Sequence, residues 1–351
     1  MSLDLVEVLI PIPLMEKFSY LPPKNNSKLL KQGSRVLVPF GKRTLVGVVW
    51  SFSERDKSSN RKYKYIKEIL DEVPLLDSNS ISLAEWSSRY YHYPLGEIIS
   101  YFFPPSLRKG KEAKFRETKY LELTSKGSFL EEETLTRAPS QQKLISILKD
   151  KKEMTLKSAQ AFGISNAAVN GLIEKGFVNR FSRELSPYKK LENKQLSSPK
   201  QLNPEQNKAV NAIKKAKDKT ITYLLDGITG SGKTEVYLQA IQKVVNEGKQ
   251  ALILIPEIGL APQAEERFRE YFGDRVMSFH SAKNEREKVD AWLGASRGLV
   301  DIIIGTRSSV FLPMKNLGII VVDEEHDLSL SLIHISEPTR PLYISYAVIC
   351  L

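Results

Sequence analysis

Cysteine is almost absent from this sequence: among 351 residues there is one, Cys350. A single thiol excludes an internal disulfide framework and any cysteine-based zinc site within the chain. The sequence also lacks an apolar run of the roughly 18 residues that a membrane helix needs. Its first residues contain neither the basic nor the apolar segment of a secretory signal, so we expect a cytoplasmic protein.

Positive charge is plentiful but unevenly distributed along the chain. The net charge of +11 divides into +3 for residues 1–100, +9 for residues 101–200 and −1 for residues 201–351. A basic excess in the first 200 residues favours a polyanionic partner, in particular a nucleic acid. The alternative is that lysine-rich loops such as Lys189-Lys190 serve only solubility.

Length and composition allow several folded domains. A chain of this length holds roughly two to four domains of ordinary size, and a hydrophobic fraction of 41% suffices for buried cores. Residues 1–105 contain short β-branched runs, Arg35–Phe40 and Thr44–Trp50, and a further candidate strand at Lys64–Leu70. We therefore expect a small β-rich domain here, followed by a helical pattern over residues 80–100.

Residues 106–188 follow the helix, helix, turn, helix, strand order of a winged-helix domain. We expect Ser140 to cap the first helix, and further helices over Met154–Phe162 and Asn166–Lys175. Strand-like sequence then closes the domain. Such modules bind DNA in many proteins, and the alternative is a scaffold or a protein-contact domain.

Residues 189–202 are rich in Ser, Pro, Lys and Asn and are typical of a linker. From residue 203 onwards, apolar runs of the buried parallel-strand type alternate with amphipathic helical segments. The strand candidates are Ile221–Leu225, Ala251–Ile255, Val300–Ile304 and Gly318–Val322, and the helix candidates are Glu235–Glu247 and Pro262–Tyr271. This alternation predicts a doubly wound α/β domain over residues 203–327.

The most specific motif is Gly227-Ile-Thr-Gly-Ser-Gly-Lys-Thr234, a P-loop pattern between a predicted strand and a predicted helix. Gly227, Gly230 and Gly232 let backbone N–H groups surround the phosphates of a nucleotide, and the helix N-terminus adds positive potential. We expect Lys233 to reach the β- and γ-phosphates and the Thr234 hydroxyl to bind Mg²⁺. A chance glycine-rich turn is the alternative, which the flanking elements disfavour.

An acidic cluster, Asp323-Glu-Glu-His326, follows the predicted strand Gly318–Val322. Acidic residues at the end of a buried strand, downstream of a P-loop, are typical of a Walker B motif. We expect Asp323 to hold Mg²⁺ and Glu324 to polarise the water that attacks the γ-phosphate. His326 either couples the nucleotide state to DNA or is an ordinary surface histidine.

These motifs resemble those of the PriA family of superfamily 2 DExH helicases. Pro256–Gln263, Phe279–Ser281 and Gly305–Ser308 look like the family's DNA-facing motifs, and Leu202–Gln206 looks like its adenine-contact segment. The resemblance implies that Gln206 contacts the adenine base. It also implies DNA contact or coupling for Glu257, Thr306 and Arg307, which follow predicted strands.

The resemblance extends to the N-terminus. The residues that are similar to the family's pocket for the 3′ end of a DNA strand are Phe18, Ser19, Tyr20, Gly41 and Lys64. Aromatic rings for stacking, a glycine for close approach and a lysine for phosphate fit that function together. The family often has an acidic residue between the two aromatics, where this chain has Ser19. Core packing of Phe18 and Tyr20 is the alternative.

As a whole, the resemblance implies a multidomain protein with a β-rich 3′-end-binding domain, a winged helix and a RecA-like P-loop lobe. The implied activity is an ATP-dependent 3′-to-5′ DNA helicase that recognises stalled forks in bacteria and starts primosome assembly. ATP and Mg²⁺ are the implied cofactors. Branched and single-stranded DNA, primosome proteins and single-strand-binding protein are the implied partners, with no membrane. The full-length family also binds zinc, through cysteine clusters that these residues lack.

The resemblance stops after residue 327. Residues Leu328–Pro341 look like translated sequencing-adapter read-through, so we expect residues 328–351 to be foreign to the natural gene. The RecA-like lobe would then be incomplete, with part of its sheet exposed. We favour the helicase for the natural gene and, for the polypeptide as given, a non-catalytic module that binds DNA forks. A P-loop translocase of restriction or repair is a third possibility, which the N-terminal pocket argues against.

Overall fold

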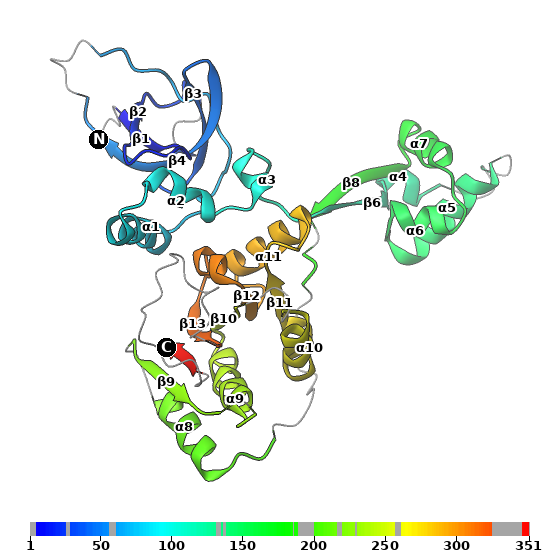
Figure 1. Ribbon diagram of the computed structural model, residues 1–351. Coiled ribbons are helices and arrows are strands. Elements are labelled where there is room, and N and C mark those ends of the chain that lie inside the picture. Colours follow the sequence, from blue (N-terminus) through cyan, green and yellow to red (C-terminus); the bar gives the residue numbers. More distant parts are fainter. Residues whose placement is uncertain are drawn as a thin grey trace. The chain divides into compact units, whose positions relative to one another are not determined.

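The structure is a computed structural model that divides into two compact units (Figure 1). The larger unit consists of Met1–Ala113 and Tyr188–Leu351, and the smaller unit of Lys114–Pro187. The residues described are 5–25, 29–55, 61–130, 135, 138–184, 186–188, 200–215, 220–228, 230–256, 261–324 and 346–350, with only the backbone for 261 and 346–350. Among their helices, none combines the length and the apolar character needed to span a bilayer.

A five-stranded antiparallel sheet forms the N-terminal part of the larger unit. In their order of pairing, the strands are β2 (Phe18–Tyr20), β1 (Leu5–Leu9), β4 (Arg43–Ser53), β3 (Arg35–Phe40) and β5 (Glu68–Ile69). Both faces of the sheet carry buried apolar residues, for example Val6 and Val8 on one face and Leu5 and Leu9 on the other. One face forms the core, which includes Val6, Val8, Val36, Val38, Val49 and Tyr20. The predicted strand Lys64–Leu70 is shorter than expected, since only β5 joins the sheet.

Three helices follow this sheet: α1 (Ser78–Tyr91), α2 (Leu95–Tyr101) and α3 (Pro105–Arg108). Gly96 of α2 lies against the backbone that follows β1. A Cβ atom at Gly96 would come within 2.3 Å of the carbonyl oxygen of Ile12 and 2.5 Å of that of Ile10. Only glycine allows this approach, so the position of α2 on the sheet depends on it.

A buried ion pair ties β3 to the segment around α3. The Arg35 side chain is fully buried, and its Nη2 and Nε atoms donate to the two carboxylate oxygens of Asp71 at 2.7 and 2.9 Å. The same guanidinium donates to the carbonyl oxygens of Leu107 and Lys111. These bonds satisfy the requirement that a buried charge be paired.

The C-terminal part of the larger unit is an α/β lobe with a six-stranded sheet. In their order of pairing, the strands are β11 (Val276–Phe279), β12 (Ile302–Gly305), β10 (Gln250–Leu254), β13 (Leu317–Val322), β14 (Tyr346–Cys350) and β9 (Thr222–Asp226). Strands β10 to β13 are mutually parallel, as their runs of buried Ile, Leu and Val indicate. The four predicted strands agree with β9, β10, β12 and β13 to within two residues, whereas β11 had not been predicted.

Four helices pack on the faces of this sheet: α8 (Pro204–Lys215), α9 (Lys233–Asn246), α10 (Ala261–Phe272) and α11 (Glu285–Arg297). A short 3₁₀ helix, η4 (Gly273–Arg275), precedes β11, and another, η5 (Arg307–Phe311), follows β12. Buried side chains of α8, α9 and α10 form one core with alternate residues of β10, β12 and β13. Figure 1 shows α9 and α10 side by side, where Tyr237 and Phe268 stack with ring centroids 6.2 Å apart.

Strand β14 fills the position between β13 and β9 and runs antiparallel to both. We expected this part of the sheet to be left open, because the family resemblance ends before residue 328. Instead, the last five described residues complete the backbone pairing between the two motif-bearing strands. Strand β9 remains at the edge, where the Leu224 side chain is 62% exposed. Residues 328–345 lie outside the described residues.

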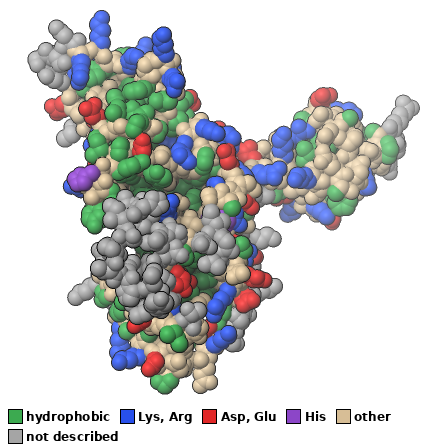
Figure 2. Space-filling view, viewed as in Figure 1, with side chains coloured by type: hydrophobic (Ala, Val, Ile, Leu, Met, Phe, Trp, Pro, Cys, Tyr) green, Lys and Arg blue, Asp and Glu red, His purple; other side chains and the backbone are tan. Residues whose placement is uncertain are grey.

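The smaller unit has a three-stranded antiparallel sheet with helices packed on it. Its elements are β6 (Glu117–Leu123), α4 (Ser125–Ser128), α5 (Pro139–Lys151), β7 (Glu153–Thr155), α6 (Leu156–Ala161), α7 (Asn166–Glu174) and β8 (Val178–Glu184). Leu121, Leu144, Val169, Leu172 and Val178 are among its buried core residues. On the face in Figure 2, Lys and Arg side chains lie at several separate places on this unit.

Two helix starts in the smaller unit differ from those predicted. Ser140 is not a cap: α5 begins at Pro139, with Ala138 before it and no side-chain cap, because proline suits the first helical position. The second helix begins after Met154, since Glu153–Thr155 pair with β6. Thr155 then caps α6 by accepting a hydrogen bond from the Ser158 N–H at 3.0 Å.

Candidate functional site

The P-loop connects the end of β9 at Asp226 to the start of α9 at Lys233. Gly230 and Gly232 have φ angles of +82° and +85°, a left-handed conformation that side chains disfavour. Nothing lies within 4 Å of where a Cβ of Gly230 would be. The loop therefore has open space beside its backbone at the N-terminus of α9, where the helix dipole favours an anion.

Lys233 lies along this loop. Its Nζ atom donates to the carbonyl oxygen of Gly227 at 2.6 Å and to that of Ile228 at 3.3 Å. Thr234, the next residue, is half-buried in the first turn of α9. The two residues that the motif assigns to phosphate and Mg²⁺ thus sit where the loop enters the helix.

Gln206, near the start of α8, contacts the P-loop from the side. Its Nε2 atom donates to the carbonyl oxygen of Ser231 at 3.0 Å. Its Oε1 atom accepts from the Asn203 backbone N–H at 2.9 Å, while the Gln206 N–H donates to the Asn203 side chain at 2.8 Å. This reciprocal pair fixes Gln206 against the loop, as a capping box does.

Asp323 and Glu324 follow β13. The Asp323 backbone N–H donates to the carbonyl oxygen of Leu254 at 2.9 Å, which holds the first residue after the strand against β10. Glu324 has a φ of +51°. A non-glycine residue in this region stores backbone strain, and such strain is common at functional sites.

The Asp323 carboxylate is electrostatically coupled to the P-loop. Burial raises the pKa of this carboxyl above its ordinary value, and the Glu324 carboxylate adds to the rise. A hydrogen bond from Tyr237 and the positive charge of Lys233 lower the pKa of Asp323. The net rise means that the protein groups around Asp323 do not fully compensate its negative charge.

These residues fit a magnesium–nucleotide group. Mg²⁺ is typically held by one or two protein oxygens together with phosphate and water, and the Asp323 carboxylate and the Thr234 hydroxyl are of that type. Within the described ranges, no group of three or more His, Cys, Asp or Glu side chains is arranged to hold a metal by itself.

Two tyrosines had escaped sequence analysis, the buried Tyr237 of α9 and the partly buried Tyr271 of α10. Tyr237 is 3% exposed, and its hydroxyl donates to Asp323 Oδ2 at 3.1 Å. Burial raises the pKa of Tyr237, and the Asp323 carboxylate adds to the rise, so its hydroxyl stays protonated. Tyr271 of α10 donates to Oε2 of the buried Glu235 at 2.7 Å. Both looked like ordinary core aromatics at helical spacing.

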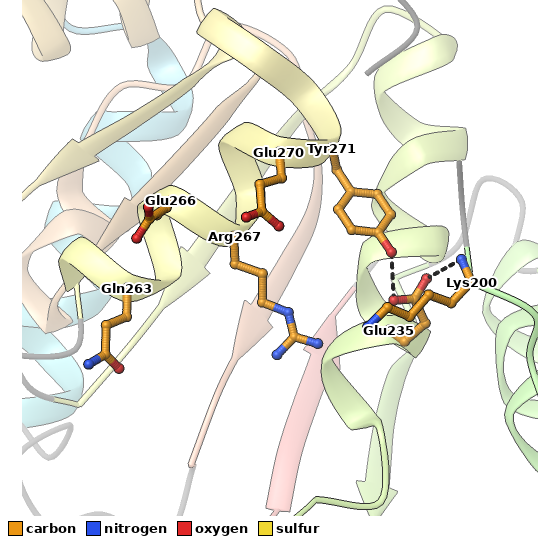
Figure 3. Close-up of a pocket in the computed structure, with 7 residues that line it drawn as sticks. All are labelled: Lys200, Glu235, Gln263, Glu266, Arg267, Glu270 and Tyr271. Carbon is orange, nitrogen blue, oxygen red and sulfur yellow. Dashed lines mark hydrogen bonds between the residues drawn. The ribbon is translucent and has the colours of Figure 1, made fainter. Parts of the chain in front are cut away.

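Glu235 forms one wall of a cavity of about 290 Å³ between α9 and α10 (Figure 3). The residues that line this cavity are Lys200, Glu235, Gln263, Glu266, Arg267, Glu270 and Tyr271. Oε1 of Glu235 also accepts from the Lys200 backbone N–H and from the Gln239 side chain. Its carboxylate is thus used within the fold.

The described DNA-motif residues follow neighbouring strands. Thr306 comes directly after β12, and Arg307 begins η5 with an exposed side chain. The Ser309 hydroxyl donates to the carbonyl oxygen of Phe279 at 3.0 Å, which joins η5 to the end of β11. His280, next in that motif, is 8% exposed. Glu257 and His326 lie outside the described residues.

The residues expected at a 3′-end pocket lie on opposite faces of strand β2. Tyr20 is 5% exposed in the core, and its hydroxyl donates to the carbonyl oxygen of Pro39 at 3.2 Å. Phe18 is partly buried on the same side and packs edge-to-face on Phe40, with ring centroids 5.1 Å apart. The core-packing alternative therefore describes Tyr20, and Phe18 in part.

Ser19 points to the other face of the sheet, toward a carboxylate that sequence analysis had missed. Its hydroxyl donates to Glu7 Oε2 at 3.2 Å, and Glu7 lies directly opposite on β1. Ser53 donates to the other oxygen of Glu7 at 2.9 Å. An acidic group is thus present beside Ser19, supplied by the neighbouring strand. Only the pairing of β1 with β2 reveals it.

Gly41 and Lys64 lie in connections outside the core. Gly41 forms the turn between β3 and β4, directly after Phe40. Lys64 is exposed, and its carbonyl oxygen accepts a hydrogen bond from the Leu21 N–H at 2.9 Å. The backbone of Lys64 is therefore paired with the residue directly after β2, and Gly41 is next in sequence to Phe40, whose ring packs on Phe18.

Two family profiles match this chain. The profile of the PriA 3′ DNA-binding domain matches residues 7–104, and that of the DEAD/DEAH box helicases matches residues 203–334. The first covers the N-terminal sheet with α1 and α2, and the second covers the α/β lobe with its P-loop. Both profiles therefore cover the parts of the chain that carry the candidate site residues.

Curated relatives named replication restart protein PriA are similar to most of the chain. The protein of Haemophilus influenzae is 33% identical over 93% of this chain and 45% of its own length. That of Chlamydia trachomatis is 34% identical over 92% of this chain and 44% of its own length. That of Bacillus subtilis is 30% identical over 89% and 47%. The chain thus spans less than half the length of these relatives.

Proposed function

The chain belongs to the PriA family of replication restart proteins, and we propose that it supplies the nucleotide-binding lobe and the 3′-end-binding domain of an ATP-dependent DNA helicase. The observation that supports the proposal most strongly is that the P-loop after β9 and the acidic residues after β13 lie at the same edge of the sheet. The charge of the P-loop residue Lys233 lowers the pKa of Asp323, and Tyr237, one turn further along the same helix, hydrogen-bonds that carboxylate. Ligands bind at this edge in open α/β folds.

The roles follow from the positions. Backbone N–H groups of the loop from Gly227 to Gly232 hold the phosphates, and Lys233 neutralises their charge. Thr234 and Asp323 hold Mg²⁺, which supplies Lewis-acid stabilisation of the phosphate charge. Glu324 orients the attacking water, and Gln206 contacts the adenine from the side of the loop. His326 couples this site to bound DNA.

DNA binding involves both parts of the larger unit. In the N-terminal sheet, Phe18 and Gly41 receive the terminal base, with Tyr20 supporting them from the core. Ser19, together with Glu7, offers polar atoms to the terminal sugar, and Lys64 offers a charge to phosphate. In the lobe, Glu257, Thr306 and Arg307 contact the strand on which the motor moves.

The domain division that we propose is residues 1–105 for 3′-end binding, 106–188 for a winged helix, 189–202 for a linker and 203–327 for the first RecA-like lobe. The order of helices and strands in the smaller unit supports the winged-helix assignment. In the whole protein we propose 3′-to-5′ unwinding at stalled forks, primosome proteins and single-strand-binding protein as partners, and a zinc site outside this chain. Residues 328–351 stay a proposed non-native segment.

Nucleotide binding tests the first part of the proposal. A fluorescent ATP analogue with Mg²⁺ should bind the chain, and Lys233→Ala should weaken binding at least about ten-fold because the charge on the β- and γ-phosphates is lost. Lys208→Ala, at an exposed position of α8, is the control and should bind as the unmodified chain does. Absence of binding in the unmodified chain would overturn the nucleotide site.

A fork with a free or a phosphorylated 3′ end tests the second part. We expect tighter binding to the free 3′ hydroxyl. Lys64→Ala should weaken binding, whereas Lys62→Ala, equally exposed two residues away, should not. Equal binding to both forks would contradict 3′-end recognition.

The second candidate is a non-catalytic module that binds DNA forks. Motors of this class close ATP between two lobes, and the matched part is 45% of the Haemophilus influenzae relative. We therefore expect the 351-residue chain to bind DNA without unwinding it. DNA-stimulated ATP turnover by this chain would refute the module and favour the motor.

A further inference from the structure

One buried phenol connects the two motifs of the nucleotide site. Tyr237 lies one helical turn after Lys233 on α9, so it faces the same side as the first turn. Its hydroxyl donates to Asp323 Oδ2 at 3.1 Å, and the Thr234 side chain lies close enough to the same hydroxyl to lower its pKa. The P-loop helix and the residue after β13 are therefore joined through a single side chain.

The Tyr237 ring has little freedom to move. It is 3% exposed and stacks on Phe268 of α10 at an interplanar angle of 11°. Phe268 stacks in turn on Phe272, and both are buried in the core of the lobe. A hydroxyl on a ring that is held in this way has one position, and so do the groups that it bonds.

We infer that Tyr237 is a positioning residue, which sets the distance and orientation between the Thr234 hydroxyl and the Asp323 carboxylate. The inference rests on the proposed function, in which these two groups hold Mg²⁺. Without the Tyr237 hydroxyl, the Asp323 carboxylate loses the hydrogen bond that orients it, and the Thr234 side chain loses a polar neighbour. The affinity for nucleotide should then fall mainly where Mg²⁺ takes part, because outer-shell partners tune metal affinity.

The structure offers a matched control on the neighbouring helix. Tyr271 is also a tyrosine whose hydroxyl donates to a carboxylate, Oε2 of Glu235, at 2.7 Å (Figure 3). Glu235 lies on α9 as Tyr237 does, and it is 5% exposed. The Tyr271→Phe and Tyr237→Phe changes therefore remove the same atom and the same kind of bond, although Tyr271 is only partly buried against this core. Of the two tyrosines, Tyr237 is the one bonded to a proposed Mg²⁺ ligand.

The test is the affinity of the 351-residue chain for a fluorescent ATP analogue, with Mg²⁺ and with a chelator in its place. Tyr237→Phe should weaken binding roughly ten-fold with Mg²⁺ and leave binding in the chelator unchanged. Tyr271→Phe should change neither affinity. Thermal unfolding of each variant shows whether it is folded at the temperature of the binding experiment.

Each other outcome has a distinct meaning. Equal weakening with and without Mg²⁺ would make Tyr237 a structural residue, and an unchanged affinity with Mg²⁺ would remove it from the site. The same loss in Tyr271→Phe would attribute the effect to the core. If Tyr237→Phe fails to fold, Phe268→Leu, which removes the ring that stacks on Tyr237, must show a Mg²⁺-dependent loss of affinity, and a Mg²⁺-independent loss or none overturns the assignment. An unmodified chain that binds no nucleotide overturns the proposed function itself.

Discussion

In the α/β lobe the proposed nucleotide residues follow the carboxyl ends of strands, whereas in the N-terminal sheet two of the proposed DNA-contact residues lie inside a strand and face the core. Lys233 and Asp323 follow strands that the hydrophobic core already fixes. Tyr20, by contrast, is a member of the core itself. In the lobe, the proposed site residues are therefore distinct from the residues that form the core. In the N-terminal sheet, some residues belong to both groups.

Because of this difference, a loss of function after a substitution has a different meaning in each region. A loop residue at a strand end can be changed with little effect on folding, because few buried contacts depend on it. A core residue in a small sheet contributes to stability before it contributes to binding. Loss of function therefore has a direct meaning in the lobe and needs a stability measurement in the sheet.

The largest expected effect is the loss of the ion pair beneath the N-terminal sheet. Asp71→Ala leaves the Arg35 guanidinium buried without its carboxylate, which should lower the free energy of unfolding by roughly 3–5 kcal/mol. Urea unfolding measures this change. Arg269→Ala in the lobe removes a half-exposed pair with Glu265 and should cost less than about 1 kcal/mol. Similar costs for both variants would mean that the sheet does not depend on buried polar groups in the way proposed.

Tyr20 gives the next largest effect and bears directly on the comparison. Tyr20→Ala removes a ring that is 5% exposed and should cost about 3 kcal/mol of stability. Tyr20→Phe loses only the hydrogen bond to Pro39 and should cost about 1 kcal/mol. DNA binding by the folded Tyr20→Phe variant should stay close to that of the unmodified chain. A large loss of 3′-end binding at unchanged stability would place Tyr20 among the contact residues.

A smaller change in stability is expected on the lobe side. Lys233→Ala removes two hydrogen bonds to carbonyl oxygens of its own loop, so the free energy of unfolding should change by less than about 1 kcal/mol. Urea unfolding of this variant, beside its loss of nucleotide affinity, measures how far the site is separated from the scaffold. A loss as large as that of Tyr20→Ala would abolish the distinction between the two regions.

Sequence patterns gave a good account of the lobe because its strands are long runs of one residue class. Runs of three to five apolar residues located β9, β10, β12 and β13, and the P-loop located the start of α9. Strand β11 escaped because Val276–Phe279 is short and contains the polar Ser278. Tyr237 escaped for a different reason: on a buried helix face, a tyrosine in the core and a tyrosine at a site have the same pattern.

The N-terminal pocket was less predictable because its arrangement depends on pairing between strands. Three residues, Phe18–Tyr20, are too few for their own alternation to show which face is buried. Only the register with β1 shows that Ser19 meets Glu7 while its neighbours face the core. In the smaller unit, Ser140 failed as a helix cap because Pro139 already occupies the first turn.

The smallest expected effect concerns His280 in the lobe, a buried group beside the proposed DNA edge. Burial lowers the pKa of its imidazole, Lys283 and Lys288 lower it further, and Glu265 and Glu287 oppose them. The folded state thus binds the proton less tightly than the unfolded chain. The resulting stability is fully present above the unfolded pKa and is lost as the pH falls toward the lowered folded pKa.

Replacing the imidazole should therefore flatten part of the pH dependence of stability. Between neutral and mildly acidic pH, the free energy of unfolding of His280→Gln should fall less than that of the unmodified chain, because no proton is taken up at this site on unfolding. His92→Gln, at an exposed position after α1, is the control for the loss of an imidazole. Urea unfolding across this pH range measures both. Parallel pH profiles for His280→Gln and the unmodified chain would assign the acid sensitivity of the lobe to other groups, and His280 would then resemble Lys233, whose replacement we expect to change stability little.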